Sequence, residues 1–212
     1  MIGAMSSVRP VSLDDIRAAR ERIKGVAVRT PLVRLLHGMK GPEIWLKLEN
    51  LQPINAFKLR GAANAVAMLD PDERSRGIWT ISAGNAGQGV AYAAREAGVP
   101  CTVVVIDKAA ETKVQRMRDL GAHLVKAPFD QAWQAMEDRA FPGVEGTFVH
   151  PFDDHNFIAG NATVGLEILE DLPKVKTVIA AIGGGGLVTG VGSAIRALAP
   201  RVSILGAEPE TA

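Results

Sequence analysis

The sequence is poor in several features that would point to particular classes of protein. It has one cysteine, Cys101, so no disulfide can form within the chain, and a buried thiol in a reducing compartment is expected. Its 24 basic and 23 acidic residues leave a net charge of +1, which predicts neither a nucleic-acid nor a membrane partner. No apolar stretch approaches the roughly 18–20 residues that cross a bilayer, and residues 1–10 lack the apolar core of a signal peptide. We therefore expect a soluble, cytoplasmic globular protein.

Common motifs for nucleotides and metals are also missing. The dinucleotide fingerprint G-x-G-x-x-G fails because, counted from Gly183, its last position is Val188. No G-x-x-x-x-G-K-[ST] phosphate loop is present. The four histidines do not have the spacing of metal ligands, and Cys101 has no evident activating partner. A nicotinamide enzyme is therefore a distant alternative, and Cys101 is not a candidate nucleophile.

Two further groups of side chains are assigned structural roles. His150, Asp153 and Asp154 lie near the end of a predicted strand, where loop and helix-capping roles are expected. The three tryptophans are expected in the core or at an interface: Trp45, Trp79 and Trp133.

The pattern of apolar residues predicts strands that alternate with helices. Two runs, 102–106 and 177–182, are continuously apolar, which is typical of strands buried on both faces. Such strands between helices predict an α/β fold with parallel-rich sheets flanked by helices. The remaining expected strands are 44–48, 78–81, 123–126 and 203–206. One helix is expected to begin after Ser12, and the others are expected at 88–97, 112–120, 131–140, 156–169 and 187–198.

Lys58 is the first candidate for chemistry. A lysine in a helix-like segment is usually a solvated surface residue. An amine that forms a Schiff base, however, must be partly desolvated so that its neutral form is accessible. Phe57 and Leu59 flank Lys58, and Gly61 allows close backbone approach. The context therefore favours a buried, reactive amine.

Two glycine-bearing segments downstream carry the other groups that such a site needs. The turn around Gly84 and Asn85 can present an amide to a phenolic oxygen and backbone N–H groups to a carboxylate, although a plain turn is the simpler interpretation. Four glycines, 183–186, lie between an apolar run and a helix-like segment. Such a turn often only allows tight packing, but its N–H groups can also converge on a phosphate. A compact monophosphate fits this loop better than a dinucleotide.

In this order the three segments resemble the fold-type-II pyridoxal-phosphate (PLP) enzymes, specifically the threonine/serine dehydratase and serine racemase group. The resemblance covers nearly the whole chain and includes Arg29-Thr30-Pro31-Leu32, Lys47-Leu48-Glu49-Asn50-Leu51-Gln52, Phe57-Lys58-Leu59-Arg60-Gly61-Ala62 and His150-Pro151-Phe152-Asp153-Asp154. It implies that Lys58 bonds the cofactor covalently and acts as general base. It also implies that Phe57 packs beside the cofactor ring and that Asn85 bonds the phenolic oxygen. The remaining implied contacts are with the phosphate, from Gly183, Gly184, Gly185, Gly186 and Leu187, and with the substrate carboxylate, from Ser82, Ala83, Gly84, Asn85 and Ala86.

The resemblance implies an overall organisation as well. The family fold, which is tryptophan synthase β-like, has two α/β domains with the cofactor between them. By this likeness residues 1–74 are the first part of the large domain, 75–151 are the small domain, and 152–212 continue the large domain. Family members extend well beyond the position of Ala212, so we expect a large domain that is incomplete at its C-terminus. A homodimer is implied by likeness alone.

A metal site is implied at the end of the chain. In metal-dependent relatives the positions of Glu208 and Ala212 supply two ligands for Mg²⁺ or Ca²⁺, and the third ligand, an acid, follows shortly after. In this chain the third ligand falls beyond Ala212. We therefore expect an incomplete site with weak affinity.

Departures from the family pattern bear on the reaction. Ala83 stands where serine racemases carry the serine that protonates the second face of the substrate carbanion, which favours elimination over racemisation. Ala86 replaces a histidine, and Ile54-Asn55-Ala56 replaces Thr-Gly-Ser, which suggests a substrate that is bulkier than threonine or differently charged. We expect an ammonia-lyase that converts a 3-hydroxy amino acid, such as threonine, serine or a related compound, to a 2-keto acid and ammonia. The alternatives are an amino-acid racemase, a cysteine-synthase-like β-replacement enzyme, and a PLP-binding fragment without turnover.

Overall fold

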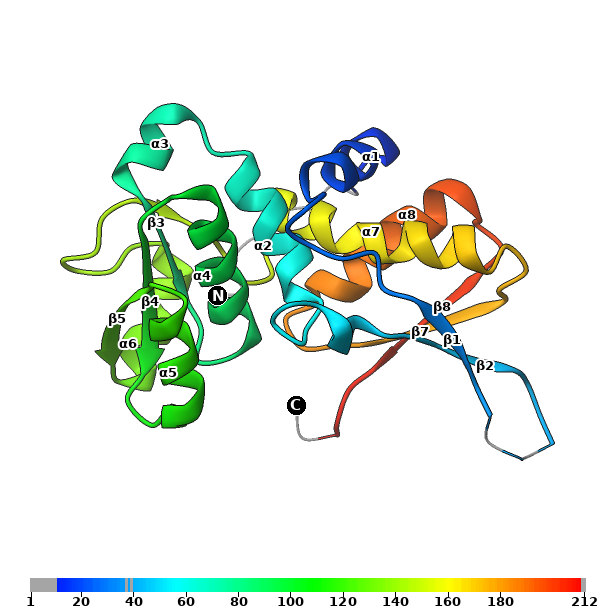
Figure 1. Cartoon of the computed structure of the whole chain (residues 1–212). Coiled ribbons are helices and arrows are strands. Elements are labelled where there is room, and N and C mark those ends of the chain that lie inside the picture. Colours follow the sequence, from blue (N-terminus) through cyan, green and yellow to red (C-terminus); the bar gives the residue numbers. More distant parts are fainter. Residues whose placement is uncertain (1–10, 37, 39, 211–212) are drawn as a thin grey trace, which may run out of the picture.

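The computed structural model describes residues 11–36, 38 and 40–210. Two groups of elements lie on either side of helix α2 (Lys58–Ala67), as Figure 1 shows. One group is built from the middle of the sequence, and the other joins the N-terminal segment to the C-terminal one. The predicted division into residues 1–74, 75–151 and 152–212 stays a prediction.

The first group is a parallel sheet covered on both faces. Its strands follow the order β5 (His123–Ala127), β4 (Cys101–Ile106), β3 (Ile78–Ile81) and β6 (Thr147–Phe148). All neighbouring pairs are parallel. Residues of β4 contribute to two separate apolar clusters, one with α4 (Asn85–Ala97) and one with α6 (Phe129–Asp138). The predicted burial of run 102–106 on both faces is therefore confirmed. Helices α3 (Pro71–Arg76) and α5 (Glu111–Asp119) complete the group.

The second group places helices against one face of a smaller sheet. Helix α7 (His155–Asp171) is buried along most of its length and packs against α8 (Gly186–Leu198) and α1 (Leu13–Arg22). Strands β7 (Thr177–Ala181) and β8 (Ser203–Ala207) pair in parallel.

Burial along β7 corrects one expectation. Val178 and Ala180 are buried, but Ile179 between them is 67% exposed. On β8 the apolar side chain of Leu205 is also exposed. The prediction that run 177–182 is buried on both faces is therefore wrong for the described part of the chain, because its helices cover only one face of this sheet.

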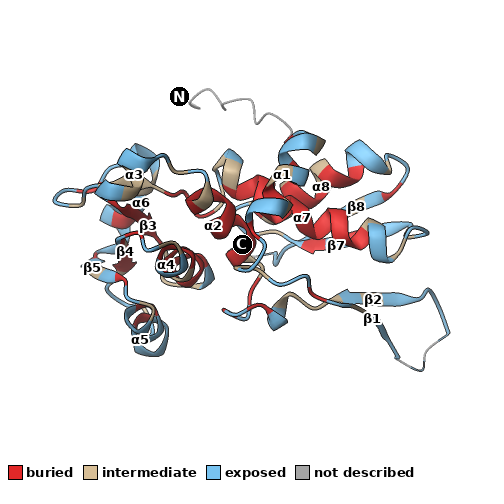
Figure 2. Ribbon diagram, turned by 45° about the horizontal axis from the view of Figure 1, so that its top comes forward, coloured by how far each residue is buried: buried red, intermediate tan, exposed pale blue. Residues whose placement is uncertain are grey.

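An antiparallel hairpin extends from the second group. It consists of β1 (Leu32–Leu35) and β2 (Ile44–Lys47), and only β2 was expected from the sequence. Figure 2 shows the hairpin mostly in the colour of exposed residues, and Val33 and Leu46 are among its exposed apolar side chains. A short 3₁₀ helix, η1 (Glu49–Leu51), follows and leads to the lysine segment.

Local sequence signals account for the helix ends. The Ser12 hydroxyl accepts a hydrogen bond from the N–H of Asp15 at 3.1 Å and caps α1 as predicted. Gly98 ends α4 in the left-handed conformation, with φ of 66°. Within the described residues, no helix combines the length and apolar character needed to cross a membrane.

The contact between α2 and α7 positions the candidate site. A Cβ atom at Gly61 would collide with the Phe157 ring, and one at Gly160 would collide with the carbonyl oxygen of Arg60. Only glycine therefore allows the two helices to pack this closely. On the other side of α2, a Cβ at Gly89 of α4 would lie 3.2 Å from the carbonyl oxygen of Lys58. Helix α2 is thus held between α7 and α4.

Candidate active site

Lys58 is the first residue of α2, and its partly buried side chain places the amine near three aromatic rings. Its Nζ donates a hydrogen bond to the carbonyl oxygen of Pro151 at 2.6 Å. The amine lies 5.4 Å from the ring centre of Phe57, 5.5 Å from that of Phe157 and 6.0 Å from that of Phe152. Phe57 was expected beside the cofactor ring, and that role stays a prediction. Phe157 was missed, since it is far away in sequence and no local pattern indicates the contact.

Burial makes the Lys58 amine easier to deprotonate. Desolvation lowers its pKa from 10.5 to about 8, and no acid among the described residues opposes the shift. At neutral pH the neutral amine is therefore far more abundant than for an exposed lysine, and only the neutral amine is a nucleophile or a base. The predicted desolvation of Lys58 is present in the structure.

Arg60, two residues further along α2, is also buried but is fully paired. Its guanidinium contacts Glu167 of α7 at 2.7 Å and Glu49 of η1 at 2.8 Å. Lys47 joins the same cluster through an ion pair of 2.6 Å with Glu167. Burial alone would raise the pKa of Glu49, but the hydrogen bonds and charge of Arg60 outweigh it and lower that pKa. This four-residue cluster ties α2 to α7 and to the strand before it.

The predicted carboxylate-binding loop lies at the carboxyl end of β3 and starts α4. The N–H of Gly84 donates to the Ser82 hydroxyl at 3.1 Å, and Gly84 is the N-cap of α4. Asn85 is exposed at the first position of the helix, and Ala83 is partly exposed. Ala86 is buried, so its side chain packs inward and only its backbone faces the loop. Because α4 packs against α2, this loop and Lys58 belong to the same part of the molecule.

The glycine run connects β7 to the N-terminus of α8. Gly185 has φ of 81° and serves as the N-cap, and Gly186 is the first helical residue. A Cβ at Gly183 would meet no atom within 4 Å, whereas a Cβ at Gly184 would collide with the Phe152 ring. Leu187 turns its side chain into the apolar cluster beneath the helix. The loop thus leaves open space over its backbone on one side and packs on Phe152 on the other.

Phe152 joins the separate parts of the candidate site. Its ring lies near the Lys58 amine and against Gly184, while its backbone N–H donates to Nδ1 of His150 at 3.3 Å. The segment that carries it leaves the sheet beside the Ser82 loop, because β6 pairs with β3 and Thr80 donates to the carbonyl of Val149 at 2.8 Å. Phe152 therefore links the lysine to the glycine run, a contact that the sequence analysis missed. That the lysine and both loops form one site stays a prediction.

Asn161 forms a hydrogen bond with the backbone of the glycine run. This α7 residue is fully buried, and its Nδ2 donates to the carbonyl of Gly186 at 3.3 Å. Its Oδ1 atom is buried without a hydrogen-bond partner among the described residues. The sequence offered no signal for this contact, since the two residues lie on separate elements.

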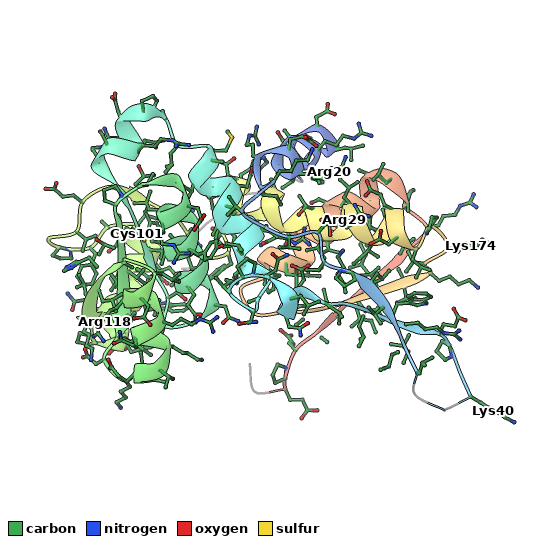
Figure 3. All side chains as sticks on the ribbon, viewed as in Figure 1. Arg20, Arg29, Lys40, Cys101, Arg118 and Lys174 are labelled. Atoms are coloured by element: carbon green, nitrogen blue, oxygen red, sulfur yellow. The ribbon has the colours of Figure 1, made fainter. Side chains whose placement is uncertain are left out.

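Other expected residues take structural positions. Asp154 is the N-cap of α7 and accepts from the N–H of Phe157 at 2.7 Å, which confirms its capping role. Trp79 lies in the core, whereas Trp133 is 51% exposed on α6. Cys101 is buried in β4, where desolvation raises its thiol pKa to about 12 (Figure 3). A thiol with such a pKa is inert, as expected.

Charged residues around the end of α7 form pairs with one another. Arg20 and Arg29, which are labelled in Figure 3, contact Glu170 at 2.5 and 2.6 Å. The predicted metal ligand Glu208 is exposed, and Ala212 lies outside the described residues. The described part of the chain contains no group of three or more His, Cys, Asp or Glu that could hold a metal ion. The metal site stays a prediction.

Comparisons with known proteins agree with this geometry. A family described as pyridoxal-phosphate dependent enzyme matches residues 23–212. The L-threonine ammonia-lyase of Thermotoga maritima is 44% identical over 204 residues, which cover 94% of this chain and 51% of that protein. The crystal structure of serine racemase from Dictyostelium discoideum aligns with a TM-score of 0.85 at 34% identity and covers 96% of this chain and 67% of the other. The structure of maize serine racemase aligns with a TM-score of 0.85 at 34% identity over 95% of this chain and 62% of the other.

The match extends over most of the chain but only part of each relative. The chain spans between 51% and 62% of the length of three curated relatives, one of which is the Thermotoga maritima enzyme. The predicted resemblance to threonine dehydratases and serine racemases and the predicted α/β fold class are both confirmed. The chain belongs to the pyridoxal-phosphate-dependent enzyme family.

Proposed function

We propose that this chain carries the lysine-bearing part of a PLP-dependent ammonia-lyase that eliminates the hydroxyl group of a 3-hydroxy amino acid. The products would be a 2-keto acid and ammonia. The observation that carries this proposal is the Lys58 amine, which is buried among aromatic rings, has a pKa lowered to about 8, and has no acidic partner among the described residues. Similarity to threonine ammonia-lyases supports the reaction class.

The residues of the site fit PLP. The open backbone at Gly183 and Gly185, at the N-terminus of a 13-residue helix, suits a phosphate group that accepts hydrogen bonds from N–H groups. Asn161 holds the loop through Gly186. Phe57 would pack beside the cofactor ring, and Asn85 would bond its phenolic oxygen. When bound, PLP supplies an aldehyde that takes up primary amines and a ring that withdraws electrons from the substrate.

The residues of the chain would divide the work as follows. Lys58 would hold the cofactor, and its amine would remove the proton from Cα of the substrate, because its lowered pKa lets it act as a base near neutral pH. The backbone of 82–86, with the Ser82 hydroxyl, receives the substrate carboxylate at the start of α4. The aromatic rings around Lys58 limit the access of water.

Racemisation is the second candidate, since serine racemase structures align over nearly the whole chain. It would need an acid on the face of the substrate opposite Lys58. Ala83 cannot supply a proton, and the Ser82 hydroxyl, whose oxygen accepts from the N–H of Gly84, is assigned to the substrate carboxylate. Elimination needs no such second acid and is therefore favoured. The two-domain division, the homodimer and the metal site remain predictions for the whole protein.

The proposal is tested by adding PLP to the purified chain, recording the visible absorbance, reducing with borohydride and mapping the modified peptide. The expected adduct is on Lys58. Lys47 is a matched control within the same molecule, because its side chain is also buried but is paired with Glu167. An adduct on Lys47, or an equal distribution over surface lysines, would contradict the assignment.

Turnover is measured separately as 2-keto acid release from threonine and serine. Lys58→Ala should abolish both the adduct and keto-acid release. Chiral analysis of the remaining amino acid distinguishes elimination from racemisation. Inverted amino acid without keto acid would favour the racemase, and an adduct without either product would favour a binding fragment.

A further inference from the structure

A cavity beside Phe152 is not used by the proposed chemistry. Its volume is about 310 Å³, which lies at the lower end of the range for small-ligand sites, roughly 300–1,000 Å³. One wall comes from α6, with Trp133 and Met136, and the floor comes from His150 and Phe152. Its rim carries charged side chains, including Arg139 and Asp153.

The cavity adjoins the surroundings of Lys58. Phe152 lines the cavity and also lies 6.0 Å from the Lys58 amine. The residue between the two floor residues is Pro151, whose carbonyl accepts the hydrogen bond from Lys58. The cavity also lies at the carboxyl end of β6, next to the loop that follows β3, which is the edge where ligands bind in parallel α/β sheets. A substrate held at Lys58 by its amino group can therefore direct its side chain toward this cavity.

The lining disfavours an acidic substrate side chain, because Glu137 and Asp153 are carboxylates and its one described arginine is paired. Trp133, Met136 and Phe152 present apolar or aromatic surfaces. The His150 ring is buried edge-on against Phe152, with centroids 4.5 Å apart, and burial lowers its pKa, which favours the neutral ring. The one arginine among the described lining residues is already engaged, since Arg139 donates to the carbonyl of Asp153 at 3.2 Å and lies 3.6 Å from its carboxylate.

Two contacts hold the side chain of Trp133 in one position. Its indole N–H donates to Glu137 at 3.0 Å, and its ring stacks on Phe129 with centroids 6.2 Å apart. Half-exposed tryptophans that are fixed in this way supply large contact area with little loss of side-chain entropy on binding. Packing of the core does not account for a tryptophan at this exposed position.

We propose that this cavity binds the side chain of the substrate and that Trp133 selects 3-hydroxy amino acids with an aryl or similarly bulky uncharged group over threonine and 3-hydroxyaspartate. This inference rests on the proposed function, because it assumes that the amino acid is held at Lys58. A threonine methyl group would leave the cavity almost unfilled, whereas a phenyl ring can contact both Trp133 and Phe152.

The test compares equilibrium binding of 3-phenylserine, threonine and 3-hydroxyaspartate to the full chain with added PLP, measured by calorimetry. We expect 3-phenylserine to bind about tenfold or more tighter than threonine, which is the size of effect that filling an apolar pocket gives. We expect 3-hydroxyaspartate to bind no better than threonine. Trp133→Ala should reduce the preference for 3-phenylserine by about tenfold, mainly through weaker binding of 3-phenylserine. The variant should fold, since the side chain is half exposed.

Trp45→Ala is the matched control, because Trp45 is a partly buried tryptophan on β2 and does not line the cavity. The preference must survive in this variant. The inference is overturned if no preference is found, if it survives Trp133→Ala, or if neither amino acid binds. Keto-acid release without any aryl preference would overturn this inference alone. An aryl preference that depends on Trp133, with a Lys58 adduct but without keto acid, would overturn the proposed reaction and leave the cavity assignment standing.

Discussion

Lys58 and Arg60 are two cations on the same turn of α2, and their surroundings differ completely. Arg60 is 1% exposed and contacts two carboxylates, whereas Lys58 lies near three aromatic rings and has a single carbonyl as partner. Burial lowers the pKa of Lys58 to about 8. For Arg60, burial also favours the neutral form, but the hydrogen bonds to Glu49 and Glu167 outweigh it and raise the pKa.

The comparison separates two uses of a buried charge. Arg60 is unreactive because it is fully paired, and it joins α2 to α7. Lys58 lacks a charged partner, which lowers stability but yields a reactive amine. If this division is correct, replacing Arg60 should lower the stability of the fold. Replacing Lys58 should raise stability at neutral pH and remove the reactive amine.

The largest effect is expected from Arg60→Met. The change leaves Glu49 and Glu167 buried with a lost partner, and breaking a buried pair in this way costs about 3–5 kcal/mol. The free energy of unfolding, measured by urea denaturation, should fall by about that amount. A loss below about 1 kcal/mol would mean that the cluster is solvated and that the contrast with Lys58 is much weaker than the structure indicates.

A smaller loss is expected from Glu167→Gln. The amide keeps the shape of the side chain but removes the charge that serves both Arg60 and Lys47. Hydrogen bonds to charged groups contribute about 1.5–3 kcal/mol, and the unfolding free energy should fall within that range. Glu170→Gln is the control, because Glu170 lies on the same helix but its ion pairs are more exposed. Equal losses in the two variants would contradict the special role of the buried cluster.

Lys58→Met should change stability in the opposite direction at neutral pH. The amine has a pKa of about 8 in the folded chain and 10.5 when unfolded, so below about pH 8 the folded state carries the full penalty of a desolvated charge. As pH rises from about 8 to 10.5 the unfolded chain binds more protons, and the stability of the unsubstituted protein increases. The variant should lack this increase. Parallel pH curves for the two proteins would show that the Lys58 pKa is not lowered.

The smallest effect is expected from Arg95→Ala. Arg95 pairs with Glu96 at 3.1 Å, but both side chains are exposed, and such pairs contribute about 0.2–1 kcal/mol. The unfolding free energy should change by no more than this and should become less sensitive to salt. A loss as large as that for Glu167→Gln would mean that burial does not separate the strong pairs from the weak ones.

The sequence predicted the parts of this molecule that depend on local signals. Apolar runs and glycine positions located most of the strands and helices, and the segment around Lys58 predicted a desolvated amine. The partners of Arg60 could not be predicted in this way, because Glu167 is 107 positions distant and nothing in its neighbourhood indicates the pairing. The same reason explains why Phe157 and the cavity beside Trp133 were missed.

The β7 strand shows a second limit of local reasoning. Its apolar run is as continuous as that of β4, yet Ile179 is exposed while Val104 is completely buried. Composition indicates that a strand can be buried on both faces, but only the arrangement of neighbouring elements decides whether both faces are covered. In β4 helices lie on each side, and in the described part of the second group they lie on one.

The close contact of α2 and α7 has a consequence for movement. Gly61 and Gly160 bring the two backbones together without space for a single additional carbon atom, and the Arg60 cluster fastens the same crossing. This packing opposes sliding or rolling of the helix. The backbone of Lys58 is therefore held in place, and its four methylene groups are the flexible part. Movement of the amine toward a ligand must come from rotation about its own side-chain bonds.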